Sequence, residues 1–273
     1  MQSTTSLEGK TAIVTGGSRG IGAACAIQFA KKGISALAIT YVSNKELAEE
    51  VVKKCRGLGV AKVVAIHSDL LDPHVGPQLV DRVLKELGAK TIDILVNNAV
   101  LTKVPMFEPF EKITVENFRD MMQGDLFGPI NIIAAVLPHL PPRGGRVINI
   151  SSCASKQAVA DPMMLYGAAK AGLDSFTRSL AAQYGIKTLA TFNSISVGAT
   201  ETDALQKAID IYRSVVDDPQ EMMIQQCTAE KRVADPEDVA FVVGFLATEE
   251  ARWINGAQIP ANGGVRDLIA LQG

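Results

Sequence analysis

The chain has 273 residues, a formal net charge of -2 and 47% hydrophobic residues. This length suits one α/β domain or two small ones, and the near-neutral charge gives no basis for binding nucleic acid or an anionic membrane. The four cysteines form no C-x-x-C pair and the three histidines have no ligand spacing, so we expect no metal site and a reducing, cytoplasmic compartment. No apolar run reaches the length of a membrane span, and the polar N-terminus does not resemble a secretory signal.

Apolar runs rich in β-branched residues alternate along the chain with segments of helical periodicity. We expect strands at residues 11–14, 36–40, 60–66, 92–96, 146–150, 188–195 and 258–260, and helices at residues 21–32, 45–56, 72–87, 115–137, 165–184 and 236–248. Strands that lack surface alternation predict a parallel sheet covered on both faces. We therefore predict an α/β fold over residues 1–273, a single doubly wound Rossmann-type domain with a parallel seven-stranded sheet.

One segment, residues 197–235, interrupts the alternation between the sixth strand and the last helix. It contains helical patches, among them the apolar group Met222, Met223 and Ile224. Long insertions at the carboxyl end of a strand often form substrate lids in such folds, although a plain packing hairpin is the alternative. We favour a lid that covers an apolar substrate, since methionine side chains adapt to irregular shapes.

A glycine-rich turn, residues 15–22 (T-G-G-S-R-G-I-G), joins the first strand to the first helix. A side chain at Gly16 or Gly22 would hold the helix off the strand or push a bound phosphate away. The free N–H groups of the first helical turn would then face an anion, and a dinucleotide pyrophosphate is the obvious candidate. The spacing differs from the usual G-x-G-x-x-G fingerprint, and a tight connection without a ligand is the alternative.

The residues after the second strand indicate which dinucleotide is preferred. A carboxylate about twenty positions past the glycines binds the ribose 2′-hydroxyl in NAD-dependent proteins. Here residues 40–44 carry no acid, and Glu46 already lies in the next helix. Arg19 within the turn is a fixed cation that can reach a 2′-phosphate, and Ser43 and Asn44 can add hydrogen bonds. We therefore predict NADP(H) rather than NAD(H), although Arg19 is open to the alternative of a solvated loop charge.

Tyr166 and Lys170 are four residues apart at the start of a predicted helix, so they share one face. An ammonium group beside a phenol favours the phenolate, and a tyrosine pKa lowered from about 10 towards 7 would suit proton transfer to a carbonyl oxygen. Ser151 and Ser152 end the fifth strand just upstream and can hold the substrate oxygen. The alternatives are a surface pair for Tyr166 and Lys170 and a strand-end cap for the serines.

Several separated motifs together resemble the short-chain dehydrogenase/reductase family, and the resemblance covers nearly the whole chain. They are the turn at residues 15–22, S-D-L at 68–70, N-N-A at 97–99, I-N-I-S-S at 148–152, Y-G-A-A-K at 166–170, P-E-D-V-A at 236–240 and N-G-G at 262–264. The family, including reductases of 3-oxoacyl chains, implies hydride transfer from NADPH to a carbonyl carbon. Tyr166 would protonate the oxygen, Ser152 would orient it, and Lys170 would lower the tyrosine pKa.

The resemblance also implies which residues bind the cofactor and how the chain assembles. The cofactor-binding residues would be Gly16, Ser18, Arg19, Gly20, Ile21, Gly22, Tyr41, Ser43, Asn44, Asp69, Leu70, Asn98, Ala99, Tyr166, Lys170, Val197, Gly198, Thr200 and Thr202. A homodimer or homotetramer would pack through the helices at residues 115–137 and 165–184.

The chain departs from the family pattern at four places near one end of the pocket. Val100 replaces the glycine of the N-N-A-G motif, and Val197-Gly198 replaces a Pro-Gly pair, which is expected to loosen that loop. Asp125 stands at the fourth catalytic position, where the family has asparagine; it could pair with Lys170 and weaken its effect on Tyr166, or serve as a proton relay. Ser152 lies fourteen residues before Tyr166, and Cys153 occupies the usual spacing of thirteen.

Two functional hypotheses follow. The first is an NADPH-dependent oxidoreductase that reduces a carbonyl or imine group of a small to mid-sized apolar metabolite. The second is a repurposed protein of secondary metabolism whose pocket also or instead catalyses a non-redox step such as cyclisation. The intact Ser152, Tyr166 and Lys170 favour the first, and Asp125, Val100 and Val197 keep the second open. A non-catalytic interaction protein would bind no nucleotide at all.

Overall fold

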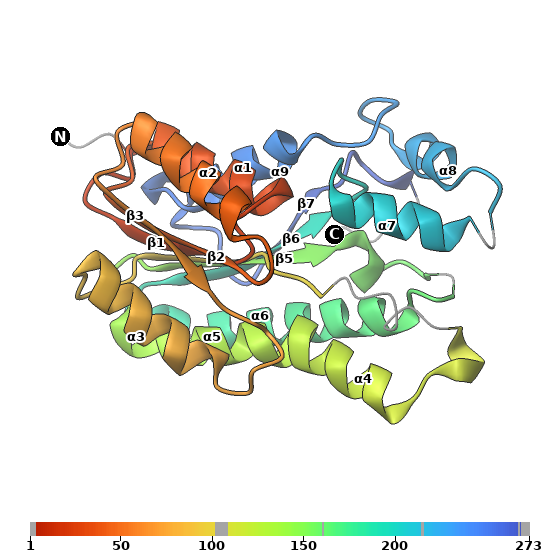
Figure 1. Ribbon diagram of the computed structural model, residues 1–273, viewed down its shortest axis with the longest axis horizontal. Coiled ribbons are helices and arrows are strands. Elements are labelled where there is room, and N and C mark those ends of the chain that lie inside the picture. The colour runs from red at the N-terminus through yellow and green to blue at the C-terminus, as the bar shows by residue number, and fades with distance from the viewer. Residues whose placement is uncertain (1–3, 102–108, 160, 214–215, 267, 269–273) are drawn as a thin grey trace.

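The computed structural model describes residues 4–101, 109–159, 161–213, 216–266 and 268. The ends of the predicted domain, residues 1–3 and 269–273, lie outside them. Strands and helices alternate through the first six strands (Figure 1). The strands are β1 (Thr11–Val14), β2 (Ala36–Tyr41), β3 (Lys62–His67), β4 (Ile94–Asn97), β5 (Arg146–Ser152), β6 (Thr191–Val197) and β7 (Gln258–Ala261). The α-helices are α1 (Gly20–Lys31), α2 (Lys45–Gly57), α3 (Val75–Leu87), α4 (Val115–Met122), α5 (Gly128–Val136), α6 (Met164–Thr188), α7 (Asp203–Tyr212), α8 (Pro219–Gln226) and α9 (Pro236–Leu246).

All seven strands form one parallel sheet in the order β3-β2-β1-β4-β5-β6-β7, which confirms the predicted fold class. The chain runs outward from β1 to β3, and then returns to place β4 on the other side of β1. Ligands of open α/β sheets bind at such a reversal, beyond the carboxyl ends of the strands. The topology therefore directs attention to the ends of β1 and β4.

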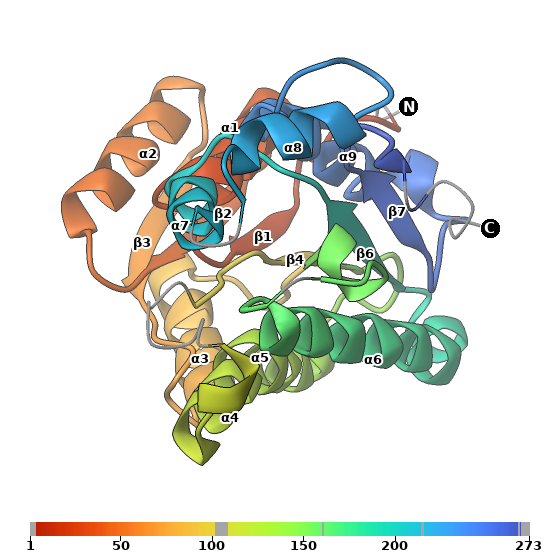
Figure 2. The same ribbon diagram turned by 90° about the vertical axis from the view of Figure 1, so that its right-hand side faces the viewer.

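Helices cover both faces of the sheet. The helices α1, α2 and α9 lie on one face and α3, α5 and α6 on the other (Figures 1 and 2). Alternate strand residues enter the two cores, so that Ala12 and Val14 of β1 pack on one side and Ile13 on the other. Because both faces are buried, the strands carry continuous apolar runs rather than an alternating pattern.

The segment at residues 197–235 contains α7 and α8, which lie over the carboxyl ends of the strands (Figure 2). The Thr202 hydroxyl accepts a hydrogen bond from Leu205 N at 3.2 Å and caps the start of α7. The Asp218 carboxylate accepts one from Glu221 N at 2.9 Å and caps α8. The role of this segment as a substrate lid stays a prediction.

Several elements differ from the sequence prediction, most of them by one or two residues at an end. The helix predicted at residues 115–137 contains a π-helical turn at Gln123–Phe127, between α4 and α5. The helix predicted from residue 72 begins at Val75, because the Asp72 carboxylate accepts from His74 N at 2.8 Å in the preceding turn. The helix predicted to end at Tyr184 continues to Thr188, so the prediction that β6 starts at Thr188 is wrong.

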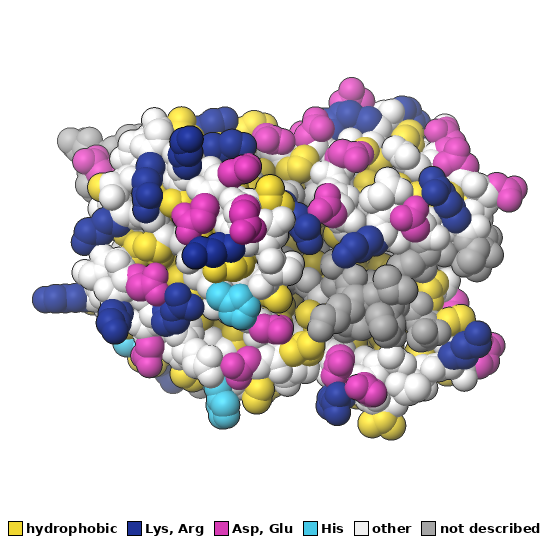
Figure 3. All heavy atoms as spheres, viewed as in Figure 1, with side chains coloured by type: hydrophobic (Ala, Val, Ile, Leu, Met, Phe, Trp, Pro, Cys, Tyr) yellow, Lys and Arg dark blue, Asp and Glu magenta, His cyan; other side chains and the backbone are white. Residues whose placement is uncertain are grey.

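Within the described residues, no helix is long and apolar enough to cross a membrane. On the face shown in Figure 3, basic and acidic side chains are interspersed. An anionic ligand would therefore be recognised on this face by individual side chains rather than by a broad basic surface.

Candidate active site

The glycine-rich turn is tied to the ends of three neighbouring strands. The Thr15 hydroxyl accepts hydrogen bonds from Asn98 N (2.9 Å) and Ala99 N (3.0 Å) beyond β4. The Asn98 side-chain amide donates to Thr15 O (2.9 Å) and Gly16 O (3.1 Å). Gly16 N donates to the hydroxyl of Thr40 in β2 at 2.9 Å. Sequence reasoning missed the roles of Thr15 and Thr40, although a threonine at or near the carboxyl end of each strand was a usable signal.

The close approach of these segments explains two of the glycines. A Cβ at Gly22 would collide with Gly16 O and the Asn98 amide, and one at Gly16 would lie 2.9 Å from the Cα of Ala99. Gly16 also has φ of +64°, which L-residues rarely adopt. The amides of the first turn of α1 have no side-chain cap, and that turn carries no acidic residue. The turn therefore fits an anion such as a pyrophosphate.

The residues predicted around the adenosine end lie beyond β2 and β3. The Tyr41 ring packs edge-to-face on His67, with ring centroids 5.8 Å apart. Ser43 is exposed, and the Asn44 side chain caps α2 by accepting from Leu47 N at 3.0 Å. Asp69 accepts from Leu71 N at 3.0 Å, which fixes its side chain. One oxygen each of Asn44 and Asp69 is thus already engaged within the chain.

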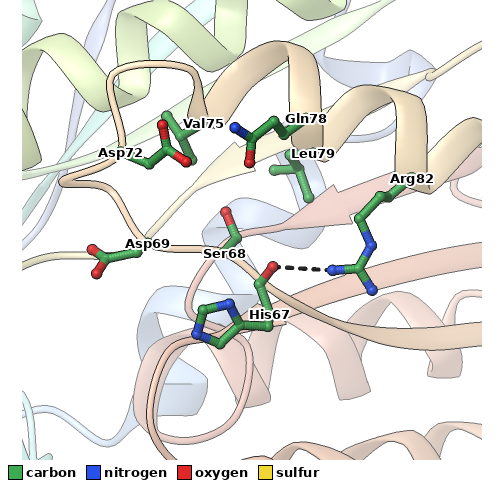
Figure 4. Close-up of a pocket in the computed structure, with 8 residues that line it drawn as sticks. All are labelled: His67, Ser68, Asp69, Asp72, Val75, Gln78, Leu79 and Arg82. Carbon is green, nitrogen blue, oxygen red and sulfur yellow. Dashed lines mark hydrogen bonds between the residues drawn. The ribbon is translucent and has the colours of Figure 1, made fainter.

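A small pocket of about 200 Å³ lies between the end of β3 and α3 (Figure 4). Arg82 donates to His67 O at 3.2 Å across one side of it. The Asp69 carboxylate points away from Gln78 and Arg82 in this view. Asp69 nevertheless lines the pocket, which therefore adjoins the β3–α3 connection that carries the predicted adenosine-contacting residues.

Arg19 forms an ion pair that the sequence did not predict. Its Nη1 lies 2.9 Å from Oδ2 of Asp203, the first residue of α7. The structure thus brings Arg19 to the segment at residues 197–235. No local pattern could reveal this contact, because the two residues are far apart in the sequence.

Ser152, Tyr166 and Lys170 meet at the carboxyl end of β5. Ser152 is the last residue of β5, and Tyr166 lies in the first turn of α6. The buried Lys170 lies under the Tyr166 ring, with Nζ 5.6 Å from the ring centroid, and donates to Ile150 O at 3.3 Å. The Ser152 hydroxyl also accepts from Ala154 N at 3.2 Å, so it caps the strand end as well. The structure therefore brings the predicted catalytic residues together.

In the chain without a cofactor, the pKa of Tyr166 is raised, and the lowered pKa that we predict from Lys170 and a bound nicotinamide is not present. Burial raises the pKa of Tyr166 above its ordinary value, and the negative charge of Asp125 raises it further. A hydrogen bond with Ser152 lowers this pKa, but it does not overcome burial. The phenol is consequently held in its protonated form.

Asp125 lies in the π-helical turn, fully buried. Its Oδ1 accepts from Leu101 N at 2.9 Å, and its Oδ2 has no hydrogen-bond partner among the residues that the structure describes. Burial raises the pKa of Asp125, while the charge of Lys170 lowers it. Asp125 and Lys170 are therefore coupled electrostatically, but the predicted direct ion pair is not among those of the described residues. Short π-helical turns within α-helices often occur at functional sites.

Residues 197–235 contact the loop that follows Ser152. The Gln157 side chain donates to that of Gln226, at the end of α8, at 2.9 Å. The half-buried Tyr212 of α7 has a pKa raised by burial and then by Cys153. Cys153 also raises the pKa of Tyr166, so this thiol acts electrostatically on both tyrosines. This segment thus borders the same site as the catalytic residues.

The loop after β6 packs against β7, and the loosening expected at Val197-Gly198 stays a prediction. Val197 pairs with Ala261 of β7, and a Cβ at Gly198 would lie 3.0 Å from backbone atoms of Asn262. The buried Thr200 donates to Gly198 O at 3.1 Å. The chain therefore reaches Thr202 and α7 through a well-packed connection.

Comparisons with known proteins agree with this geometry. The profile of a family described as Enoyl-(Acyl carrier protein) reductase matches residues 16–266. The chain is 51% identical over 264 residues to the short chain dehydrogenase asqE of Emericella nidulans, which covers 97% of this chain and 96% of asqE. It is 48% identical over 267 residues to the short chain dehydrogenase penD of Penicillium thymicola, covering 97% and 94% of the two chains.

Solved structures give the same result. The crystal structure of the angucycline C-6 ketoreductase LanV with bound NADP matches with a TM-score of 0.82 and 34% identity, covering 95% of this chain and 96% of LanV. Other similar structures contain NADPH or NADH, the nicotinamide cofactors typical of such enzymes. The chain therefore belongs to the short-chain dehydrogenase/reductase family and is an oxidoreductase.

Proposed function

We propose that the chain uses NADPH to reduce a carbonyl or imine group of a small to mid-sized apolar metabolite in secondary metabolism. The observation that carries this proposal is the convergence of Ser152, Tyr166 and Lys170 at the carboxyl end of β5. The ketoreductase LanV, a similar structure, contains NADP and supports the same reaction class.

Each residue would have a separate task. The cofactor, when bound, supplies the hydride to the substrate carbon. The Tyr166 hydroxyl gives its proton to the substrate oxygen, and the Ser152 hydroxyl holds that oxygen in place. The Lys170 ammonium stabilises the phenolate that remains. Because burial raises the pKa of Tyr166, the side chain is in the form that can donate.

The cofactor preference rests on charge. The carboxyl end of β2 and the following residues up to Asn44 carry no acid that would repel a 2′-phosphate. Arg19, half exposed beside the turn, is a cation that can bind one. Gly16, Gly20, Gly22 and Asn98 would surround the pyrophosphate, and the first turn of α1, which has no side-chain cap and no acidic residue, supports an anion at this place.

The segment at residues 197–235 would serve as the substrate lid. Its link from Gln226 to Gln157 and the approach of Tyr212 to Cys153 support this role. The half-buried Met222 and Met223 would offer an adaptable apolar surface. The alternative, a packing hairpin, predicts that shortening α8 leaves the KM for all substrates unchanged.

We also propose that the protein is a cytoplasmic homodimer or homotetramer. Large apolar side chains of α4, α6 and the π-helical turn are exposed, namely Phe118, Phe127, Met164 and Phe176. These segments adjoin each other on one side of the molecule (Figure 2). A monomeric mass in light scattering would contradict the assembly.

Fluorescence titration with NADPH and NADH, followed by a carbonyl and imine panel, tests the function. Tight NADPH binding, weaker NADH binding and turnover of a panel member are expected. NADPH binding without turnover would favour the non-redox alternative. If neither nucleotide binds, both the redox and the non-redox hypotheses are contradicted.

A further inference from the structure

The first turn of α7 rests on the glycine-rich turn. Nη1 of Arg19 lies 2.9 Å from Oδ2 of Asp203, and the side chains are 48% and 64% exposed. At the adjacent position, a Cβ on Gly20 would lie 2.9 Å from Cγ2 of Thr202. Thr202 caps α7 through Leu205 N. The proposed lid thus starts directly against the residue that would bind a 2′-phosphate.

Asp203 places a negative charge beside the glycine-rich turn, which itself contains no acidic residue. The first turn of α1 has no acidic residue, and among the ion pairs of the described part of the chain, Arg19 joins only Asp203. A carboxylate and a phosphate that approach the same guanidinium repel each other, and they compete for its donors. Because both side chains are half exposed, the ion pair is weak enough to be displaced.

We propose that Asp203 sets how tightly the turn holds the 2′-phosphate of NADP(H). Its carboxylate engages Arg19 in the free chain, and it must be displaced or share the guanidinium when the 2′-phosphate binds. Asp203 therefore weakens NADPH binding and speeds release of the oxidised cofactor, a step that limits many enzymes of this kind. This inference rests on the proposed function, since it needs a cofactor that carries a 2′-phosphate.

The test compares dissociation constants of NADPH and NADH for the full chain, measured by fluorescence titration. In Asp203→Asn we expect NADPH to bind about three- to tenfold more tightly and NADH to change less than twofold. The difference should shrink at high salt, because the competing charges are exposed. Asp203→Glu should restore wild-type affinity for NADPH, which a merely structural role of the side chain does not predict.

Asp210→Asn is the matched control. Asp210 is also an exposed carboxylate of α7, but it pairs with Arg213 at 3.2 Å rather than with the turn. The same loss of charge there should leave both constants unchanged. In an Arg19→Ala background, Asp203→Asn should likewise have no effect, because the group for which the anions compete is gone.

The two proposals fail in different ways. If Arg19→Ala weakens NADPH and NADH equally, the NADP(H) preference itself is wrong. If Arg19→Ala is selective but Asp203→Asn weakens NADPH, or changes both nucleotides alike, only the role of Asp203 is overturned. Circular dichroism and melting curves of each variant show whether it is folded before its constants are compared.

Discussion

The ammonium group of Lys170 lies 5.6 Å from the centroid of the Tyr166 ring and donates its hydrogen bond to Ile150 O of β5. The backbone of the strand therefore fixes the lysine one helical turn below the tyrosine. The phenol is surrounded by protein, and burial together with Asp125 raises its pKa. This arrangement keeps the phenol of Tyr166 protonated, as its proposed role of proton donor requires.

Replacing Tyr166 by phenylalanine should abolish most turnover but leave cofactor binding intact. The substitution removes the proton donor and keeps the ring that packs over Lys170. General acid catalysis contributes about 10²- to 10⁴-fold, so kcat should fall by that factor. Cofactor oxidation and a parallel binding titration measure the two effects.

Tyr184→Phe is the matched control for this variant. Tyr184 lies on the same helix and contacts Phe192, with ring centroids 6.5 Å apart, away from Ser152 and Lys170. Its loss of a hydroxyl should leave kcat within about twofold, in keeping with its place outside the proposed proton path. Equal losses in both variants would contradict the role of Tyr166.

Much of the fold could be predicted because its signals are local. Strands buried on both faces carry β-branched apolar runs, and their alternation with helices implies the parallel sheet. The predicted helix end at Tyr184 is wrong because Gly185 does not end the helix but allows close packing. A Cβ at Gly185 would lie 2.6 Å from the side-chain amide nitrogen of Asn255. The helix ends instead at Thr188, and the next residue, Leu189, has φ of +51°.

The candidate site was less predictable because it depends on contacts between distant segments. The Y-x-x-x-K spacing places Lys170 near Tyr166, but it does not reveal that burial and Asp125 dominate the pKa. The π-helical turn around Gly124 was not predicted from the sequence; it fits against Leu101, whose side chain would collide with a Cβ at that glycine. The Arg19–Asp203 pair likewise arises only in three dimensions.

Asp125→Asn should shift the pH dependence of reduction towards lower pH. Reduction needs protonated Tyr166, so its rate falls as pH rises through the pKa of that residue. The charge of Asp125 raises this pKa, and its removal lowers it. The alkaline decline of kcat should therefore begin at a lower pH in the variant. Asp120→Asn removes a charge paired with Arg119 at 3.0 Å and should leave the profile unchanged.

The substitution Asp125→Asn should also stabilise the protein at neutral pH. The pKa of the buried Asp125 is raised above its ordinary value of 3.8, so the folded chain binds more protons at this group than the unfolded chain. Its contribution to stability is present below 3.8 and is lost as pH rises through the folded-state pKa. Asparagine keeps the acceptor for Leu101 N and removes the charge. We expect a gain of about 1–2 kcal/mol at neutral pH that disappears in acid, measured by denaturant unfolding. A lower stability of the variant at neutral pH would contradict this account.

Gly22→Ala should destabilise the glycine-rich turn and weaken cofactor binding. The added methyl group would meet Gly16 O and the Asn98 side chain, both of which hold the ends of β1 and β4 together. Overpacking of this kind costs about 1–3 kcal/mol, and the turn would shift away from any bound pyrophosphate. Gly57→Ala is the control, because Gly57 ends α2 with nothing within 4 Å of an added Cβ; this change should be neutral or slightly stabilising. Melting curves and NADPH titration should separate the two variants, and equal behaviour would show that the turn tolerates a side chain at Gly22.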